Sequence, residues 1–345
     1  MDFTIAGILG LYGITNGAIY ALVAIALVLV FAVTRIVFIP QGEYVAFGAL
    51  TMALLQEGRT PGTVWLLLLM AALASAMDVA QAVRDRWAPA RLGRELLRNG
   101  LLPLLAAGLV IVLAPAKPTL LVQAALTLAL ITPMGPLVYR LAYRSLADSS
   151  VLSLLIVSVG VHFALTGLGL LFFGAEGFRN PPFWDARFSL GALSITGQTL
   201  IIFAASAALI AGLFMFFDRT LSGKALRATS VNRTGARLMG ISTDGAGTLS
   251  FTMAAFIGAL SGLLIGPSTT VFYDSGFLIG LKGFVAAVFA GLTSFPLALV
   301  GALGVGLIES FGSFWASAFK EVIVFTAILP VLLWRSYFDA DHEDH

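Results

Sequence analysis

Cysteine is absent from this 345-residue chain, and charged residues make up only 11% of it. Without cysteine no disulfide can form, which excludes the small secreted scaffolds that depend on disulfides. The net charge of +2 at pH 7 provides no broad basic surface for nucleic acid. Disorder is excluded too, because disordered chains have low hydrophobicity.

Side chains for catalysis or metal binding are also scarce. Of the three histidines, only His162 lies outside the last four residues, and it stands alone in an apolar run. A metal site needs three or four converging ligands, and the apolar runs contain no suitable spacing. Gly223-Lys224 is followed by Ala225, so no phosphate-binding loop is completed. We predict a protein that is not an enzyme, has no metal site and binds no ATP itself.

Apolar residues, in contrast, make up 59% of the chain, with a mean hydropathy of +0.97. A soluble domain is about 45–50% apolar, so the composition indicates an integral membrane protein. A spanning helix takes about 20 apolar residues, and the runs do not alternate as the strands of a barrel do. Eleven runs are candidates: Ile5–Val33, Val37–Leu55, Thr63–Ala80, Leu101–Ala114, Thr119–Tyr139, Val151–Gly174, Gln198–Phe217, Ala246–Gly266, Gly276–Leu292, Pro296–Ser310 and Val322–Trp334.

The predicted fold is an all-α polytopic membrane protein of about 8–11 transmembrane or half-spanning helices. Leu101–Ala114 reaches only about 21 Å as a helix and is a candidate half-helix. Residues 1–335 are predicted to form a single transmembrane domain, and residues 336–345 an acidic tail. The apolar start Phe3–Val33 has no basic region before it, so we expect a retained helix and not a signal peptide.

Basic residues predict the orientation. If the N-terminus lies outside and each run crosses once, the inner loops hold 14 of the 20 lysines and arginines. Most of them lie in Arg84–Arg98, read as a short basic loop, and in Asp218–Gly245. We therefore predict an outer N-terminus and a cytoplasmic C-terminus.

Two breaks in the apolar runs are candidates for a translocation path. In the first, Pro40 removes an amide donor and Gly42 weakens the helix, which is tolerable at membrane depth only beside a cavity. Glu43 then either lines a pathway or lies hydrated at the inner interface. The second break precedes Pro296, and interrupted segments in both halves are typical of pseudo-symmetric transporters. The candidate path residues are Gln41, Gly42, Glu43, Thr293 and Ser294.

Two further charged residues lie within the late apolar runs. Lys282 and Glu309 either extend to an interface or take part in pairing or gating.

The inner loop contains a predicted amphipathic helix from Lys224 to Met239. Leu226, Ala236 and Met239 group on one side, and Gly240 provides a stop. From the residues alone, such a helix either docks on a partner or lies on anionic lipid.

The sequence of this loop also resembles a known family. Gly223-Lys-Ala-Leu-Arg-Ala-Thr-Ser and Ala236-Arg-Leu-Met-Gly-Ile resemble the cytoplasmic coupling segment of branched-chain amino-acid ABC-transporter permeases, and most closely their H-type subunit. Gly17-Ala-Ile-Tyr-Ala-Leu-Val-Ala is similar to that family's first helix, as is Val33-Thr-Arg-Ile. Gly280-Leu-Lys-Gly-Phe-Val-Ala-Ala-Val and Lys320-Glu-Val-Ile-Val-Phe resemble its C-terminal part. The resemblance covers residues 1–56 and 120–335.

The resemblance implies a permease subunit of an ABC importer for branched-chain amino acids or a related small solute, in the bacterial inner membrane. It implies that residues 223–241 couple to a separate ATPase, which uses the ATP. It also implies a second permease subunit, a periplasmic solute-binding protein and contact with membrane lipid. The implied coupling residues are Lys224, Arg227, Arg233, Arg237, Leu238, Met239 and Gly240.

Two features depart from the family. The family pattern Asn-Phe-Ala-His-Gly-Glu-Phe is here Phe38-Ile-Pro-Gln-Gly-Glu-Tyr44, and residues 78–118 are an extra segment with two more crossings. The cargo therefore stays open between a branched-chain amino acid, an amide, urea and an aromatic acid. Two alternatives also stay open: an ion-coupled secondary transporter that uses Glu43, and a scaffold whose basic loops recruit cytoplasmic partners.

Overall fold

The structure, a computed structural model, describes residues 3–86, 88–190, 193–330 and 333. The helices of the first half are α1 (Phe3–Thr34), α2 (Gln41–Glu57), α3 (Thr63–Arg84), α4 (Pro89–Leu96), α5 (Leu102–Leu113), α6 (Leu120–Ile131), α7 (Met134–Val138) and α8 (Val151–Phe173). Those of the second half are α9 (Gly197–Arg219), α10 (Leu221–Val231), α11 (Arg233–Leu238), α12 (Thr243–Ile265), α13 (Ser275–Phe289), α14 (Phe295–Trp315) and α15 (Lys320–Thr326). Two π-helical turns, η1 (Leu97–Leu101) and η3 (Tyr139–Tyr143), and three 3-10 turns, η2 (Ala114–Ala116), η4 (Arg144–Leu146) and η5 (Ser317–Phe319), extend them.

Eight helical stretches in the described part of the chain are long and apolar enough to cross a membrane. They are Thr4–Thr34, Thr63–Arg84, Pro89–Ala116, Leu120–Leu146, Val151–Phe173, Gly197–Arg219, Thr243–Ile265 and Phe295–Trp315. The chain is therefore an all-helical, multi-pass membrane protein, which confirms the predicted fold class.

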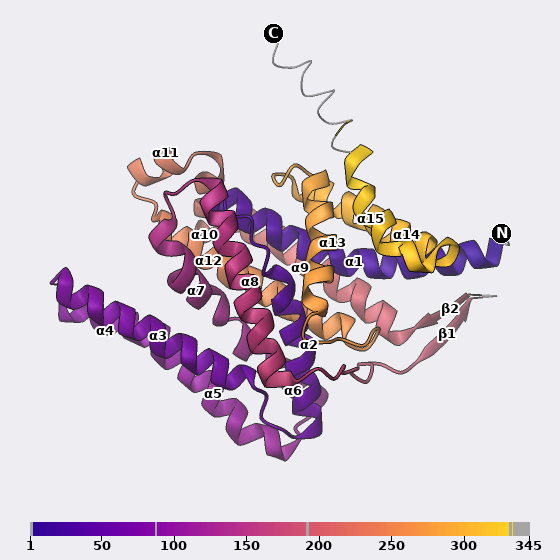
Figure 1. Cartoon of the computed structure of the whole chain (residues 1–345), viewed down its shortest axis with the longest axis horizontal. Coiled ribbons are helices and arrows are strands. Elements are labelled where there is room, and N and C mark those ends of the chain that lie inside the picture. Colours follow the sequence, from indigo (N-terminus) through magenta and orange to yellow (C-terminus); the bar gives the residue numbers. More distant parts are fainter. Residues whose placement is uncertain (1–2, 87, 191–192, 331–332, 334–345) are drawn as a thin grey trace, which may run out of the picture.

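Burial separates central helices from peripheral ones. In the most apolar stretch of α1, 89% of the residues are buried within the chain, against 22% in α8 and 17% in α9. Exposed apolar side chains such as Leu171 of α8 and Phe214 of α9 form a surface suited to lipid. Figure 1 shows α1 along the long axis of the molecule, with α14 beside it. Gly13 and Gly17 of α1 meet Leu307 and Leu303 of α14, so the two helices are antiparallel.

Helices α2 and α13 begin inside the bundle. Gln41, the first residue of α2, donates from Nε2 to the carbonyl oxygen of Ala254, in the middle of α12. Gly276, near the start of α13, contacts Gly42. With 17 and 15 residues these helices are about 25 and 22 Å long, less than the roughly 30 Å of hydrocarbon. Both are therefore too short to span by themselves, and we refer to them as half-helices.

The predicted second break is present. The chain around Thr293 is a turn between α13 and α14, and Leu292 has a φ of 58° there. The short helix α13 begins before this break, at Ser275, after the segment 266–274 that follows α12. Helix α14 has 21 residues and is long enough to span, so the run Pro296–Ser310 extends to Trp315.

The expectation that Leu101–Ala114 is a half-helix is wrong. It continues backwards through η1 and α4 into a 28-residue stretch that starts at Pro89, so Arg84–Arg98 is largely helical and not a loop. The π-helical turn at Leu97–Leu101 precedes Pro103, whose missing amide cannot join an α-helical ladder. Together α3 to α5 form a long helical hairpin.

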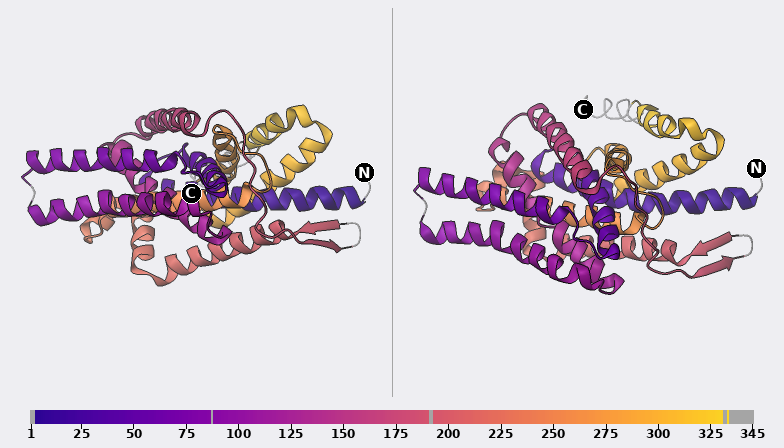
Figure 2. Two further views of the ribbon diagram at one scale, coloured as in Figure 1. Left: turned by 90° about the horizontal axis from the view of Figure 1, so that it is seen from below. Right: turned by 60° about the horizontal axis from the view of Figure 1, so that its bottom comes forward.

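The segment between α8 and α9 contains a short β-hairpin that the apolar runs did not indicate. Strands β1 (Arg187–Leu190) and β2 (Leu193–Thr196) are antiparallel, with Arg187 opposite Thr196. Figure 2 shows this hairpin at the same end of the molecule as the N-terminus, and the meeting ends of α3 and α4 at the opposite end. The predicted tail, 336–345, lies outside the described residues.

Candidate functional site

The half-helices α2 and α13 meet backbone to backbone at Gly42 and Gly276. A Cβ atom built on Gly42 would lie 1.9 Å from the carbonyl oxygen of Gly276, and one built on Gly276 would lie 2.6 Å from that of Gly42. Only glycine allows this approach. Two helix N-termini, each with a partial positive charge, are thereby brought together inside the protein.

Glu43, in the first turn of α2, lies beside this contact and is fully buried. Its Oε1 is 2.9 Å from Nδ1 of His162 on α8, whereas its Oε2 has no hydrogen-bond partner among the described residues. His162 is itself buried, and its ring lies 4.8 Å from that of Phe277. The reading that left Glu43 hydrated at an interface is therefore wrong for this structure, since the carboxylate is paired and enclosed.

Thr293 and Ser294, predicted on the same path as Gln41 to Glu43, lie elsewhere. Thr293 lines a groove of about 530 Å³ together with Leu29 of α1 and Arg227 of α10. Ser294 caps α14 by accepting the amide hydrogen of Leu297. The structure thus separates the predicted path residues into a buried cluster near Glu43 and a turn beside the inner loop.

The inner loop forms two helices and not the single one predicted from Lys224 to Met239. Asn232 has an extended backbone, with a φ of −148°, and its side chain caps α11 by accepting from the amide of Gly235. Gly240 ends α11 with a φ of 80°, as expected for a glycine stop. The helical turn is interrupted because the Asn232 side chain offers the backbone an alternative hydrogen bond.

The seven predicted coupling residues differ in their contacts and in their exposure. Arg233 donates to the carbonyl oxygen of Ala147, and Arg237 to Asp148 and to Thr243. Lys224 and Arg227 are exposed and have no ion-pair partner among the described residues, and Leu238 and Met239 are more than 80% exposed. Leu226 of α10, in contrast, is buried against Leu29, Val33, Phe217 and Ala246. The loop therefore packs on the ends of α1, α9 and α12 and exposes a surface made of both basic and apolar side chains.

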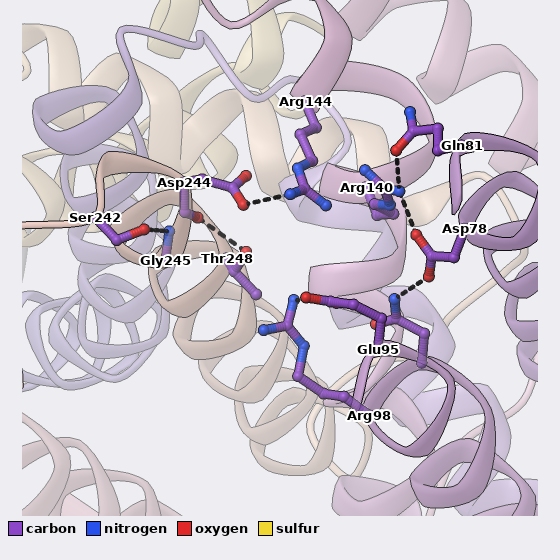
Figure 3. A network of polar contacts seen from close by, with 11 residues as sticks. Asp78, Gln81, Glu95, Arg98, Arg140, Arg144, Ser242, Asp244, Gly245 and Thr248 are labelled. Carbon is purple, nitrogen blue, oxygen red and sulfur yellow. Dashed lines mark hydrogen bonds and ion pairs between the residues drawn. The ribbon is translucent and has the colours of Figure 1, made fainter. Parts of the chain in front are cut away.

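A polar network braces the chain next to this loop (Figure 3). Arg140 of η3 pairs with Asp78 of α3 and donates to Gln81 at 2.7 Å, and Asn99 donates to the other oxygen of Asp78. Arg144, one turn further on, pairs with Asp244 at the start of α12 at 2.8 Å. Asp78 has no exposed surface and Arg140 only 6%. The network links the helical hairpin α3–α5 to the segment 144–148, with which Arg233 and Arg237 form polar contacts.

Lys282 and Glu309 are paired with one another and do not extend to an interface. Lys282 Nζ lies 2.5 Å from Glu309 Oε1, and the hydroxyl of Tyr20 donates to Glu309 Oε2 at 2.5 Å. These residues line a polar cavity of about 800 Å³ next to the β-hairpin. Of the two readings of these charges, the structure supports pairing.

The sequence indicates several of these buried polar residues, but it does not indicate which of them pair with one another. His162 was noted as isolated, Asp78 and Arg140 were not singled out, and Tyr20 carried no signal. A polar residue in an otherwise apolar helix is expensive, and that cost is the only sign that could have indicated them. The partners lie 62 to 289 positions away in the chain, so no spacing rule connects them.

Half-spanning helices that meet inside the bundle, together with buried intramembrane charges, define a membrane transport protein. Residues 101–333 match the family described as the branched-chain amino acid transport system permease component, and the chain belongs to this family. It is thus a permease component of a branched-chain amino acid type ABC transport system and not an enzyme. In such systems the ATP is hydrolysed by a partner ATPase.

Two relatives illustrate the match. The chain is 26% identical over 337 residues to the high-affinity branched-chain amino acid transport system permease protein BraD of Pseudomonas aeruginosa, which covers 94% of this chain and 92% of BraD. It is 31% identical over 201 residues to LivH of Escherichia coli K12, which covers 56% of this chain and 65% of LivH. Among solved structures, it matches a chain of PsaBC from Streptococcus pneumoniae with a TM-score of 0.35 and 14% identity, over 93% of this chain and 88% of the other.

Proposed function

We propose that this chain is the permease subunit of an ATP-driven importer that moves a branched-chain amino acid or a related small solute across a bacterial inner membrane. The observation that carries the proposal is the basic, apolar surface of α10 and α11, seated on the ends of three long helices. An exposed surface of this kind fits a docking partner. The family match supports the class of cargo.

ATP hydrolysis in that partner acts on the permease through residues 223–241. Arg227, Leu238 and Met239 contact the ATPase, since they are exposed, while Leu226 transmits its movement to α1. Lys224 adds positive charge to the contact, and Arg233 and Arg237 hold the loop in place. Gly240 ends the coupling segment.

The remaining partners are a second permease subunit, a periplasmic solute-binding protein and the surrounding lipid. Residues 1–335 act as a single transmembrane domain in this assembly, and 336–345 as a tail. The N-terminus lies outside and the C-terminus in the cytoplasm. The arginine-rich end of the α3–α4 hairpin and the loop α10–α11 lie away from the N-terminus, and this supports the orientation.

The translocation path involves the first turn of α2, with Gln41, Gly42 and Glu43, and the turn at Thr293 and Ser294. Gln41 and Glu43 have no exposed surface in this conformation. Solute can reach them only when α2 and α13 separate, which is consistent with alternating access.

The test is purification from a host that expresses the chain with its candidate partners. We expect an ATPase subunit to co-purify with the chain. The complex reconstituted in vesicles should transport labelled leucine or a related solute only when ATP is supplied on the side of the membrane that the ATPase faces. If no ATPase associates, and uptake follows a proton or sodium gradient instead, the proposal is wrong.

That outcome would favour the second candidate, an ion-coupled secondary transporter. The buried Glu43 favours it, because one carboxylate oxygen has no hydrogen-bond partner in the described part of the chain and lies close to Gly276. Glu43→Gln would then abolish ion-driven uptake.

A further inference from the structure

The cavity beside the β-hairpin has an unusual inner wall. Its volume is about 800 Å³, and its mouth is polar, with Asn16, Arg179 and Asp185. Tyr20, Lys282 and Glu309, contributed by α1, α13 and α14, are among its buried lining residues. Both charged side chains are almost enclosed, with 7% and 10% of their surface exposed.

The charges in this wall are matched in number. Lys282 Nζ lies 2.5 Å from Glu309 Oε1 and 3.0 Å from Glu321 Oε1, and Lys320 lies 3.9 Å from the same Glu321 oxygen. The ring of Tyr20 lies 5.7 Å from Lys282 Nζ, so its face adds to the environment of the cation. Two cations and two carboxylates together carry no net charge.

Stability alone does not account for such a pair. Removing two charges from water costs several kcal/mol for each ion, and well-packed apolar residues of similar volume hold helices together as well or better. Ionisable residues inside a membrane protein instead mark pathways and ligand sites. A matched pair at the end of a polar cavity is placed where a ligand from outside would arrive.

We propose that Lys282 and Glu309 form a binding site for a zwitterionic α-amino acid that enters through this cavity. The carboxylate of the ligand takes the place of Glu309 on Lys282, and its ammonium group takes the place of Lys282 on Glu309. Each buried charge keeps an opposite partner during the exchange, so no ion is left uncompensated. The site rests on the proposed function, because it assumes that a solute passes through this chain.

The same chemistry sets the selectivity among the candidate cargoes. An amide or urea carries no charge with which to displace either partner. A carboxylic acid displaces Glu309 from Lys282 and leaves that carboxylate buried without a cation. An amine takes the place of Lys282 on Glu309 but offers nothing to replace Glu309 on Lys282, which then keeps only Glu321, at 3.0 Å. Only a ligand with both groups satisfies the pair.

Binding is measured by thermal unfolding of the permease–ATPase complex in lipid nanodiscs, without the solute-binding protein and without ATP. L-Leucine should raise the Tm. Its analogues isocaproate, which lacks the ammonium group, and isoamylamine, which lacks the carboxylate, should raise it little at the same concentration. Equal shifts for all three compounds, or no shift with leucine, would overturn the site, and this comparison uses the unaltered chain, so misfolding of a variant cannot decide it.

A double variant separates binding from structure. In Lys282→Met with Glu309→Met, two apolar side chains replace the pair, and the complex should still fold and assemble. Its apparent affinity for leucine should fall by roughly thirtyfold or more. The matched control is Glu57→Gln with Arg59→Gln, which removes an exposed ion pair and should leave the affinity unchanged. Leucine binding by the double variant within twofold of the control would show that the pair is only structural.

The two proposals fail in different ways. If the chain is not part of an ATP-driven importer, the unaltered complex will show no ATP-dependent uptake, whatever the leucine shift. If only the zwitterion site is wrong, ATP-dependent uptake will persist in the Met double variant and the analogues will not differ.

Discussion

Glycine at position 42 decides whether two half-helices can meet. The carbonyl oxygen of Gly276 occupies the place that a Cβ atom at this position would take. In the sequence, Gly42 is a candidate path residue because it weakens the helix close to Pro40. Its packing role follows from a segment more than 200 residues away.

We expect Gly42→Ala to destabilise the chain by about 1–3 kcal/mol or more, because overpacking forces backbone shifts. The Tm of the purified complex should fall. Gly10→Ala is the matched control on α1: a Cβ there meets no atom within 4 Å, and alanine favours helix by about 0.5–1 kcal/mol. A Tm for Gly42→Ala equal to that of the control would contradict the close contact.

The buried ion pair of Asp78 and Arg140 is a second feature at this scale. Only 6% of the surface of Arg140 is exposed, although it lies at the end of an apolar run. Asp78→Asn would leave a buried guanidinium without its counter-charge.

We expect Asp78→Asn to cost about 3–5 kcal/mol, the usual loss for breaking a buried pair on one side. Asp85→Asn is the control, since Asp85 pairs with Arg84 on the surface and such pairs contribute about 0–1 kcal/mol. The measurement is the Tm of the two variants side by side. If both shift the Tm equally, Asp78 does not compensate Arg140.

At the scale of elements, α10 and α11 combine a fixed side with a free side. Arg233 and Arg237 bind the neighbouring segment 144–148, whereas Arg227 is exposed with no ion-pair partner among the described residues. The seven predicted residues therefore divide into positioning and contacting groups.

We expect Arg227→Glu to reduce ATP-dependent uptake about tenfold, equivalent to about 1.4 kcal/mol of coupling, with an unchanged Tm. The reason is that the reversed charge faces the ATPase and no contact within the chain is lost. Uptake and Tm are measured on the same preparation, with Arg59→Glu, at an exposed site after α2, as the control. Uptake equal to that of the control would remove Arg227 from the coupling surface.

At the scale of the whole molecule, the two ends of the long axis differ. The N-terminus and the β-hairpin occupy one end, and the joined ends of α3 and α4 occupy the other (Figure 2). Figure 1 places α10 and α11 away from the N-terminus. Because the chain contains no cysteine, a single cysteine introduced at either end is the only thiol of the chain that a labelling reagent can modify.

We expect Ser189→Cys in β1 to react with a membrane-impermeant maleimide in intact cells with a permeabilised outer membrane. Leu238→Cys, whose position is 83% exposed, should react only after the inner membrane is opened. The reason is the charge asymmetry of the loops. The reverse labelling pattern would show that the orientation is inverted.

Much of the fold could be predicted from the sequence because span length and apolarity are local properties. The runs that became α1, α3, α8, α9 and α12 were placed within a few residues of their observed ends. The α4–α5 stretch was underestimated because Arg91, Arg94 and Arg98 read as a loop, although they lie on a helix that continues into the apolar run. The loop helix was divided by Asn232, a capping preference that a pattern of apolar spacing does not detect.

Composition and residue pattern are enough to establish that the chain is a helical membrane protein, which loop is basic and amphipathic, and which polar residues are too costly to be incidental. These properties follow from hydrophobicity and charge, which each segment carries alone. Which polar residues face one another follows from the packing of the helices: Glu43 faces His162, Asp78 faces Arg140, and Lys282 faces Glu309. The scarcity of charge is the physical reason, because each buried ion in an apolar bundle must find its partner wherever the packing of other helices brings one.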